Sequence, residues 1–581
     1  MMSVLSNEWH SRVRSGQRWR LRSEGVILAL MVLLIASLSV APLLRLVWTA
    51  IAPQGVPDMA RLWRLLASER VLIATGNTLL IALSSTAISL LLGTLAAWLV
   101  ALTDLRAKTA WVFAFILPLM IPPQVTALAW LQALAPSSPL ALLFAGLGLP
   151  WFAPGEQPLY SMTGIVLLLG MHNAPLVFLT VRAGLRRLPA DLVEAAQVSG
   201  ASRWRVLFTI ILPLARPAIF AGAALTFVAA AGNFGIQAML GIPARVPTLI
   251  TLVYQQLNGI GPTALPNTAV YALLIAVITL AGMGASAWLG GRHDVRVSGA
   301  PRLWHQSLGR ARALVAALAW LWMVLTLLLP VSALLITALT HGYGQALTWQ
   351  TLTLENFRAA LWGYPAVRDA FVTSLGLTTL AAVILTLTAL FLAYFLSWRR
   401  TRLVRGLWLA SELTYALPGI VTGVAALLFF LRPLPLVNVS LYGTVWIILA
   451  AYLANFLALV LRPTLAGFAQ LEPALDEAAR LCGAGFLRRM RDILLPLAAP
   501  SALAGTVLVF LTALNEIQVS VLLVTSRTQT IGPTIVFLDE GGSASLAAAV
   551  GCLMIVVVCL LMALATRLTR RLPQGVLPWQ A

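Results

Sequence analysis

Long apolar segments alternate with short polar segments along almost the whole chain. A helix needs about 20 apolar residues to cross the hydrocarbon core of a bilayer. Segments of about this length occur near residues 26–50, 78–102, 109–134, 160–182, 216–240, 267–290, 313–338, 372–397, 405–431, 441–463, 499–524 and 545–566. A shorter apolar stretch at 138–151 is flanked by prolines, and we expect a re-entrant or external segment there. The pattern predicts an all-α polytopic membrane protein with about twelve transmembrane helices.

Composition and charge agree with this class. Hydrophobic residues make up 60% of the chain and charged residues only 10%, whereas soluble domains carry about 25% charged residues. The net charge of +20 would suit a nucleic-acid partner. However, if the N-terminus is cytoplasmic, 30 of the 39 basic residues fall in cytoplasmic segments. Cytoplasmic loops of membrane proteins carry such an excess. The charge therefore indicates topology, with both termini cytoplasmic and no role in nucleic-acid binding.

Redox and metal chemistry find little support in the sequence. The three cysteines, Cys482, Cys552 and Cys559, form no disulfide framework, and the five histidines show no ligand spacing. We expect no metal site and no catalytic residue. The first apolar run is about 25 residues long, which exceeds the roughly 7–15 residues of a signal-peptide core. We therefore expect it to remain as the first span.

A short motif occurs twice at a constant separation of 283 residues. The first copy contains Glu194, Ala195, Ala196, Gly200, Leu212, Pro213 and Pro217, and the second contains Glu477, Ala478, Ala479, Gly483, Leu495, Pro496 and Pro500. Both copies lie in arginine-bearing polar segments between apolar runs. A duplicated polar loop of unchanged length indicates a docking surface that is used twice.

The repeat extends beyond the loops. The segment 121–126 parallels 417–422, and 77–79 parallels 373–375. Each half has six predicted spans, so both halves enter the membrane in the same sense as parallel repeats. The predicted organisation is an N-terminal segment (1–25), a first domain (26–290), a cytoplasmic linker (291–312), a second domain (313–567) and a tail (568–581).

Each repeated loop is predicted to form a helix-turn-helix. In the first copy, Pro189 and Asp191 suit the start of a helix, Gly200 suits its left-handed end, and Ser202 suits the cap of a second helix. The second copy follows the same plan with Pro473, Asp476 and Gly483, but Gly485 replaces the capping residue. Such a unit between two spans would transmit force from a soluble partner.

The spacing Glu-Ala-Ala, three residues, Gly, then Leu-Pro resembles the loop signature of ATP-binding-cassette importer permeases. The resemblance covers nearly the whole chain, as a fused pair of permease domains. It implies that Glu194, Ala195, Ala196 and Gly200, with Glu477, Ala478, Ala479 and Gly483, contact two cytoplasmic ATPase subunits. It also implies an external substrate-binding protein and a bacterial inner membrane.

The chain itself lacks one requirement of such an ATPase. A phosphate-binding loop ending in Gly-Lys-Ser/Thr needs a lysine, and Lys108, the single lysine, follows no glycine-rich run. We therefore expect no enzymatic activity and no cofactor in this chain, with ATP used by the partner ATPase.

The fused arrangement resembles the ferric-iron permease group, whose relatives transport thiamine, aminophosphonates or polyamines. Three segments carry this resemblance: 233–241, 248–254 and 515–523. The sequence departs from the group at Gln237, where proline is expected, and at Ile517-Gln518. The resemblance implies iron transport, and the three related substrates remain alternatives.

Two acids lie within predicted spans, Glu412 and Glu516. Ionised carboxylates at membrane depth face a cavity or a partner. Together with Asn233, they are candidates for the transport pathway, and the alternative is a bond to a neighbouring helix or to backbone. An ion-coupled secondary transporter also uses repeats and buried acids, but it does not need a matched pair of soluble loops.

Overall fold

A computed structural model describes residues 23–138, 140–141, 146, 157–186, 190–259, 261–290, 307–342, 345, 347–399, 401–433 and 438–568. The named elements in these ranges are all helices, and an isolated bridge joins Thr340 to Leu352. The protein is an all-α polytopic membrane protein, as predicted. Most of the predicted segments 1–25, 138–151, 291–312 and 568–581 lies outside the described residues.

Ten helices in the described ranges are long and apolar enough to cross a membrane, and two bent helix pairs bring the number to twelve if each pair is one span. The spans of the first half are Ser23–Ile51, α4 (Glu69–Leu102), the pair α5 (Lys108–Met120) and α6 (Pro123–Ala133), α8 (Met162–Leu185), Trp204–Ala231, and α14 (Ala264–Gly290). The spans of the second half are Gly309–Ala338, Pro365–Arg399, the pair α19 (Arg402–Ala416) and α20 (Gly419–Phe430), α21 (Val445–Phe468), Phe486–Leu514, and Ala544–Arg567.

Several of these spans are built from consecutive helices. The component helices are η1 (Ala36–Val40), α2 (Ala41–Ile51), α10 (Arg203–Val206), η2 (Leu207–Ile211), α11 (Leu212–Ala231), η3 (Gly309–Ala311), α15 (Arg312–Met323), η4 (Val324–Leu328), α16 (Leu329–Ala338), α18 (Pro365–Tyr394), η6 (Phe395–Arg399), α23 (Phe486–Arg489), η7 (Met490–Leu494), α24 (Leu495–Leu514) and α27 (Ala544–Leu568). Shorter helices connect the spans: α3 (Met59–Leu66), α9 (Ala190–Val198), α12 (Phe234–Gly241), α13 (Leu249–Leu257), α17 (Glu355–Arg358), η5 (Ala359–Gly363), α22 (Pro473–Leu481), α25 (Ser520–Leu523) and α26 (Ile531–Glu540).

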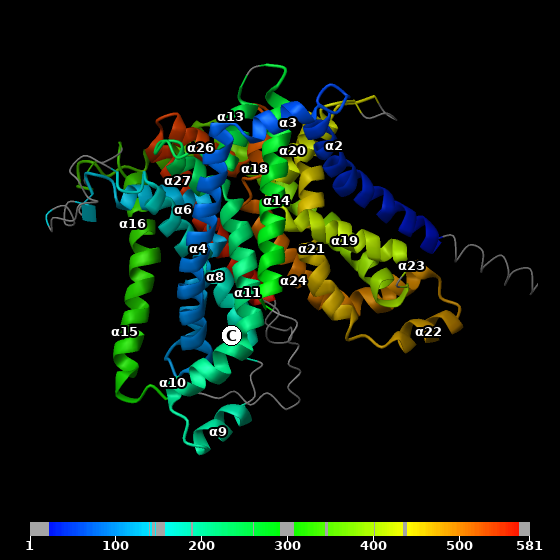
Figure 1. Ribbon diagram of the computed structural model, residues 1–581, viewed down its shortest axis with the longest axis horizontal. Coiled ribbons are helices and arrows are strands. Elements are labelled where there is room, and N and C mark those ends of the chain that lie inside the picture. Colours follow the sequence, from blue (N-terminus) through cyan, green and yellow to red (C-terminus); the bar gives the residue numbers. More distant parts are fainter. Residues whose placement is uncertain are drawn as a thin grey trace, which may run out of the picture.

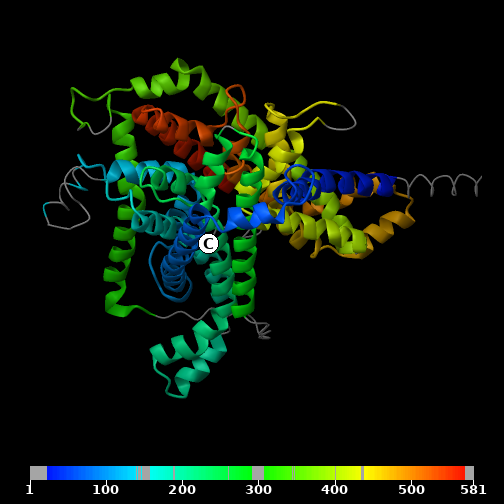
Figure 2. The same ribbon diagram turned by 45° about the horizontal axis from the view of Figure 1, so that its top comes forward.

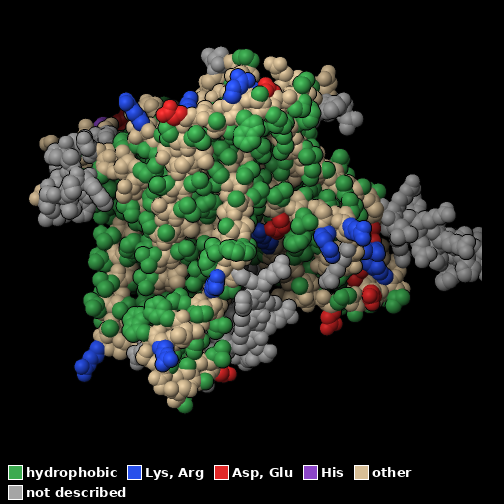
Figure 3. Space-filling view, in the orientation of Figure 1, with side chains coloured by type: hydrophobic (Ala, Val, Ile, Leu, Met, Phe, Trp, Pro, Cys, Tyr) green, Lys and Arg blue, Asp and Glu red, His purple; other side chains and the backbone are tan. Residues whose placement is uncertain are grey.

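The helices form an upright bundle with distinct ends (Figure 1). We call the end that carries α9 and α22 the loop end, and the end that carries α3, α13 and α26 the far end. The view turned by 45° shows α9 and α10 projecting beyond the bundle (Figure 2). On the visible face, charged side chains lie at the two ends and in a group toward the right of the view, and the rest of the face between the ends is mostly apolar (Figure 3). This distribution is that of a protein embedded in a bilayer.

The predicted spans 109–134 and 405–431 each consist of two helices, which are bent by 101° in the first pair and by 113° in the second. Both breaks have an extended residue followed by an extended proline: Ile121-Pro122 in the first half and Leu417-Pro418 in the second. Proline lacks the N–H donor of the helix and disfavours helical geometry in the residue before it. The parallel between 121–126 and 417–422 is therefore a repeated bend.

The predicted spans 216–240 and 499–524 are wrong at both ends. The helices begin earlier, as continuations of the repeated loops, and cover Trp204–Ala231 and Phe486–Leu514. They end before Asn233 and Glu516, where polar side chains bind backbone groups instead. Asn233 caps α12 by accepting a hydrogen bond from Ile236 N–H at 2.9 Å.

The two halves exchange their first spans. The first span packs through α2 against α20 of the second half, and the seventh packs through α16 against α6 of the first half. Polar contacts join the seventh span to the first half: Trp111 Nε1 donates to Ala319 O at 3.2 Å, and the Thr337 hydroxyl donates to Gln132 at 3.0 Å. This reciprocal exchange makes the interface between the halves part of each half's own core.

Helix α4 lies very close to α8 because glycine occupies the crossing point. A Cβ on Gly93 would lie 2.5 Å from the Ala174 carbonyl oxygen and 2.6 Å from Val177 Cβ. Gly76, on the same helix, has nothing within 4 Å of a Cβ position. Small residues allow membrane helices to approach in this way.

We predict that Gly93→Ala destabilises the bundle by about 1–3 kcal/mol, the usual cost of overpacking a close contact. Gly76→Ala is the matched control and should not lower stability. Thermal unfolding of both variants in detergent measures the difference. A Gly93→Ala protein that melts at or above the wild-type temperature would contradict the close packing of α4 on α8.

Candidate functional site: the repeated loops and the broken helices

The first repeated loop is a helix-turn-helix. Helix α9 (Ala190–Val198) has Asp191 in its first turn, and Pro189 lies outside the described residues. Gly200 adopts a left-handed conformation with φ of +83°. Gly200 N–H donates to Gln197 O at 3.0 Å, and Ala201 N–H donates to Ala196 O at 2.9 Å, which together form a Schellman motif.

The second repeated loop has the same geometry. Helix α22 begins at Pro473, and Gly483 has φ of +84°. Gly483 N–H donates to Arg480 O at 3.0 Å, and Ala484 N–H donates to Ala479 O at 3.0 Å. The two turns therefore share a Gly-Ala pair, the dihedral angle of the glycine and the pattern of hydrogen bonds.

Each turn leads directly into a membrane span. Ser202 Oγ accepts from Arg205 N–H at 3.3 Å and so caps α10, as predicted. In the second loop, Gly485 precedes α23 and provides no side-chain cap. The chain then runs through η2 or η7 into α11 or α24 without leaving a helical conformation. A displacement of either loop therefore acts on a rigid span.

Apolar side chains are exposed at equivalent positions of both loops. Val198 is 90% exposed and Leu481, 283 residues later, is 89% exposed. Leu192 and Leu475 are exposed by 41% and 42%. Exposed apolar groups rimmed by polar residues mark interaction surfaces. These four residues are not part of the motif, although each pair is separated by the same 283 residues as the two copies of the motif.

The predicted docking residues lie around these apolar groups. Glu194, Ala195 and Gly200 are exposed in the first loop, as are Glu477, Ala478 and Gly483 in the second. Ala196 is half-buried and Ala479 is buried, so they support the helix against the bundle. The structure thus brings each predicted set together on one short helix and its turn.

The two loops differ in how they are anchored. Val193 and Val206 of the first loop are both buried in the apolar core. The equivalent residues of the second loop are Asp476 and Arg489, which form a buried ion pair with Arg489 Nε 2.6 Å from Asp476 Oδ1. The same backbone unit is therefore held by apolar packing in one half and by charge in the other.

The broken helices meet where the two halves join. Asn515 Nδ2 donates to Met120 O of the first half at 2.6 Å, and Gln518 Oε1 accepts from Gly419 N–H at 3.0 Å. The Glu516 carboxylate accepts from Val519 N–H at 2.5 Å and from Ser520 N–H at 3.1 Å. Glu516 therefore caps α25. If it also lines the transport pathway, the same carboxylate must serve both as a helix cap and as a contact for the substrate.

Glu412 already has a strong partner. Arg462 donates to both of its carboxylate oxygens, at 3.2 and 2.5 Å, and so joins α19 to α21. The Arg462 guanidinium also lies over the Tyr415 ring, 4.9 Å from its centroid. Bidentate pairing of this kind orients both side chains.

Two acids at the far end were not among the predicted residues. Helix α26 ends with Asp539 and Glu540. Burial raises the pKa of both carboxyl groups, and the charge of Asp539 raises the pKa of Glu540 further. The repeat does not reveal this pair, because Leu257 and Asn258 occupy the equivalent place in the first half.

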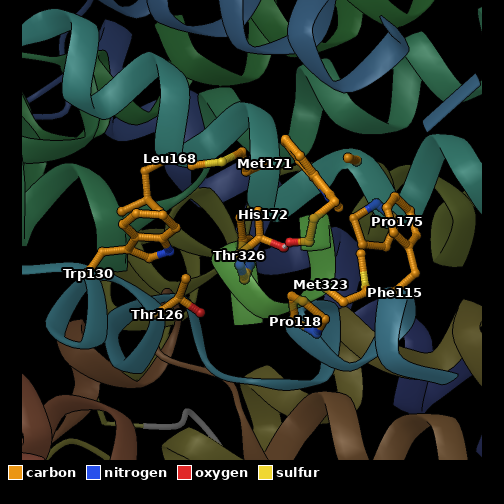
Figure 4. A pocket seen from close by; sticks show the side chains of 12 residues that line it. Phe115, Pro118, Thr126, Trp130, Leu168, Met171, His172, Pro175, Met323 and Thr326 are labelled. Atoms are coloured by element: carbon orange, nitrogen blue, oxygen red, sulfur yellow. Dashed lines mark hydrogen bonds between the residues drawn. The ribbon is translucent and has the colours of Figure 1, made fainter. Parts of the chain in front are cut away.

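A pocket lies between α5, α6, α8 and the exchanged seventh span (Figure 4). Its lining is mostly apolar and includes Met171, Trp130 and Met323, with Thr126, Thr326 and His172 as polar members. The pocket lies where the exchanged span meets the first half, and Glu516 is not among its lining residues. Within the described ranges, no group of three His, Cys, Asp or Glu residues is arranged to hold a metal ion.

Comparison with known proteins places these features in a family. Residues 89–294 and 385–574 each match the family described as "Binding-protein-dependent transport system inner membrane component". These segments contain the first and second repeated loops respectively, and together they cover more than half of the chain.

Three relatives show the extent of the similarity. The probable ABC transporter permease protein y4fN of Sinorhizobium fredii is 29% identical over 421 residues, which are 71% of this chain and 72% of that protein. The ferric transport system permease protein FbpB of Actinobacillus pleuropneumoniae is 27% identical over 69% of this chain and 57% of its own length. The molybdenum transport system permease protein ModB of Haemophilus influenzae is 34% identical over 38% of this chain and 93% of its own length.

The matches differ in what they cover. Those to y4fN and FbpB extend over about 70% of the chain, whereas the match to ModB covers 93% of that protein and only 38% of this chain. The family is matched twice, once around each repeated loop. The chain therefore belongs to the binding-protein-dependent transport system inner membrane component family, as a permease in which two copies of the domain are fused.

Proposed function

We propose that this chain forms the complete translocation pathway of an ATP-driven importer for ferric iron. The observation that supports this proposal best is the pair of matched loops, each with an exposed apolar tip and each continuous with a membrane span. A single chain with two such loops supplies docking sites for two copies of a motor.

The motor is a separate cytoplasmic ATPase that binds and hydrolyses ATP. One copy binds around Glu194, Ala195, Ala196 and Gly200, and the other binds around Glu477, Ala478, Ala479 and Gly483. The loop end then faces the cytoplasm, as do both termini, and the far end faces a periplasmic substrate-binding protein across the bacterial inner membrane. The arginine-rich segments favour this orientation.

Coupling follows from the stiffness of the helices. Closure of the two ATPases draws α9 and α22 together, and the spans Trp204–Ala231 and Phe486–Leu514 move with them because the helices are continuous. Those spans end at the breaks beside Asn233 and Glu516, where the halves meet. Alternating access results when ATP binding favours the conformation that is open at the far end.

Ferric iron is the proposed cargo because FbpB, a ferric permease by name, is matched across both halves of this chain. Thiamine, aminophosphonates and polyamines remain alternatives from the same permease group. Molybdenum oxyanions are a further alternative, because ModB is 34% identical to one half. Asn233, Glu412 and Glu516 are the proposed pathway residues, and a carboxylate there favours a cation.

We expect Val198→Arg and Leu481→Arg together to weaken ATPase binding by about tenfold or more, since loss of a central apolar contact typically costs over 1 kcal/mol. Both side chains are exposed, so the bundle should fold normally. Co-purification of the ATPase measures the effect. Val56→Arg is the matched control, because Val56 is 70% exposed in the loop between α2 and α3. If the ATPase co-purifies with the double variant as well as with the wild type, the two apolar side chains do not form the docking site.

Uptake assays test the transport function. Cells lacking the chain should lose uptake of labelled ferric iron but retain uptake of labelled thiamine and molybdate. The wild-type chain should restore iron uptake. The double variant Gly200→Pro, Gly483→Pro should not restore iron uptake, because proline cannot adopt the positive φ that both turns require. Gly76→Ala is a control that should restore iron uptake fully.

Other outcomes of this assay would point elsewhere. Loss of thiamine or molybdate uptake in place of iron would retain the permease and change the cargo. Transport by the purified chain under an ion gradient, without any ATPase, would instead support a secondary transporter.

We expect Glu516→Gln to lower the apparent affinity for ferric iron by about tenfold, which corresponds to roughly 1.4 kcal/mol of lost charge interaction. Glutamine keeps one acceptor oxygen for the Val519 N–H, so α25 should retain a cap. Iron uptake against concentration, at matched expression, measures the change. If affinity and rate equal those of the wild type, Glu516 is only a helix cap.

A further inference from the structure

The exchanged first spans of the two halves correspond position by position. The π-helical turns Ala36–Val40 and Val324–Leu328 are 288 residues apart, and so are Pro42 and Pro330, which follow them. The same separation relates Glu24 to Arg312 at the loop-end starts of the two spans. One position therefore carries opposite charges in the two halves.

Each of these two residues fastens its span to the opposite half. Arg312 forms an ion pair with Asp104, which follows α4, and Asp104 also accepts from Leu308 N–H at 2.9 Å. Glu24 forms an ion pair with Arg399, which ends the corresponding second-half span. The two ion-paired contacts thus have the same location and reversed polarity.

Among the described residues, the contact of Glu24 includes a docking loop and that of Arg312 does not. Arg489 donates to Glu24 Oε1 at 2.9 Å, and it also holds Asp476 of α22 at 2.6 Å. Asp476 pairs in addition with Arg480 at 2.6 Å, and Arg480 donates to the Tyr394 hydroxyl at 2.7 Å. We call Glu24, Asp476, Arg480, Arg489 and Arg399 the loop cluster.

The centre of the loop cluster is poorly accessible to water, whereas Arg480 and Arg399 at its edge have side chains that are 37% and 40% exposed. The side chains of Arg489 and Asp476 are each 4% exposed, and that of Glu24 is 14% exposed. Separating buried opposite charges leaves each one unpaired in a medium of low polarity, which is strongly unfavourable. Helix α22 and the start of the first span therefore move together.

The first docking loop has no comparable charge at these positions. Val193 and Val206 replace Asp476 and Arg489, and Arg312 pairs with Asp104 rather than with a residue of α9 or α10. The seventh span is thus not joined to the first loop through these positions.

We propose that Glu24 and Arg489 are positioning residues that make the exchanged first span part of the coupling path from the second docking loop. This inference rests on the proposed function, because it assumes that an ATPase moves α22. The path leads from α22 through Arg489 to Glu24, and along the first span to α2. Helix α2 packs on α20, which begins at the bend beside Gln518.

Motion of the second loop can thus reach the broken helix of its own half, the pair α19 and α20, by two routes. One is the continuous span Phe486–Leu514, and the other is the path through Glu24 and the first span. Among the described residues, the first loop has no ion pair to the seventh span at the equivalent positions. The two ATPase sites consequently drive the pathway unequally, although their docking turns are the same.

Hydrogen–deuterium exchange tests this path in the permease–ATPase complex in lipid nanodiscs, without nucleotide and with ATP and vanadate. In the wild type, nucleotide should change exchange in peptides from residues 23–51. Glu24→Gln should abolish most of that change. Asp476→Val with Arg489→Val should do the same, and this pair copies the first loop's own valines, so α22 should still fold and bind ATPase.

Arg312→Gln is the matched control, because it breaks the equivalent contact of the seventh span. It should leave the response of residues 23–51 unchanged. The inference is overturned if the valine pair responds like the wild type, or if Arg312→Gln abolishes the response equally. A wild-type complex that binds no ATPase, or shows no nucleotide response in any peptide, overturns the proposed function itself.

Discussion

Backbone groups that leave a helix inside an apolar medium need partners within the protein, and each break in this bundle is built around that requirement. Side-chain amides supply several of these partners, as Asn233 does for Ile236 N–H and Gln518 does for Gly419 N–H. Asn515 supplies another across the two halves, to the Met120 carbonyl. The irregular segments consequently lie where the halves meet. A bundle that keeps its breaks at one internal seam can open there while its lipid-facing helices stay intact.

The two halves keep one backbone design and distribute its side chains differently. In the first half, Gly235 allows close approach to Gln124; in the second, Gly419 allows close approach to Gln518. In the first half the glutamine belongs to the bent pair and the glycine to the break that faces it, whereas in the second half the glycine belongs to the bent pair and the glutamine to the break. The same logic applies to the opposite charges at Glu24 and Arg312. A dimer of identical chains would carry one residue at both positions, so contacts of opposite polarity require two different halves.

Continuous helices join the repeated loops of this permease to its membrane spans. The left-handed glycines end α9 and α22 sharply, and the following helices run into the membrane without interruption. In the second half, charges add a connection to the exchanged first span, and Arg462 holds Glu412 between α19 and α21. Buried pairs of this kind add little net stability, but they strongly favour one arrangement over alternatives in which a charge is unpaired.

The sequence by itself determined the class, the twelve apolar segments, the duplication and the turns of the loops. These properties depend on local composition and spacing: twenty apolar residues span a bilayer wherever they pack, and a glycine after a helix permits a left-handed turn in any context. Pro122 and Pro418 belong to a motif that the sequence repeats, but the sequence did not predict the bends beside them. Only the tertiary structure decided the exchange of the first spans, the partners of Glu412 and Glu516, and the link from Glu24 to Arg489. Those contacts join residues up to 465 positions apart, and a spacing pattern within one helix carries no information about which distant helix will lie against it.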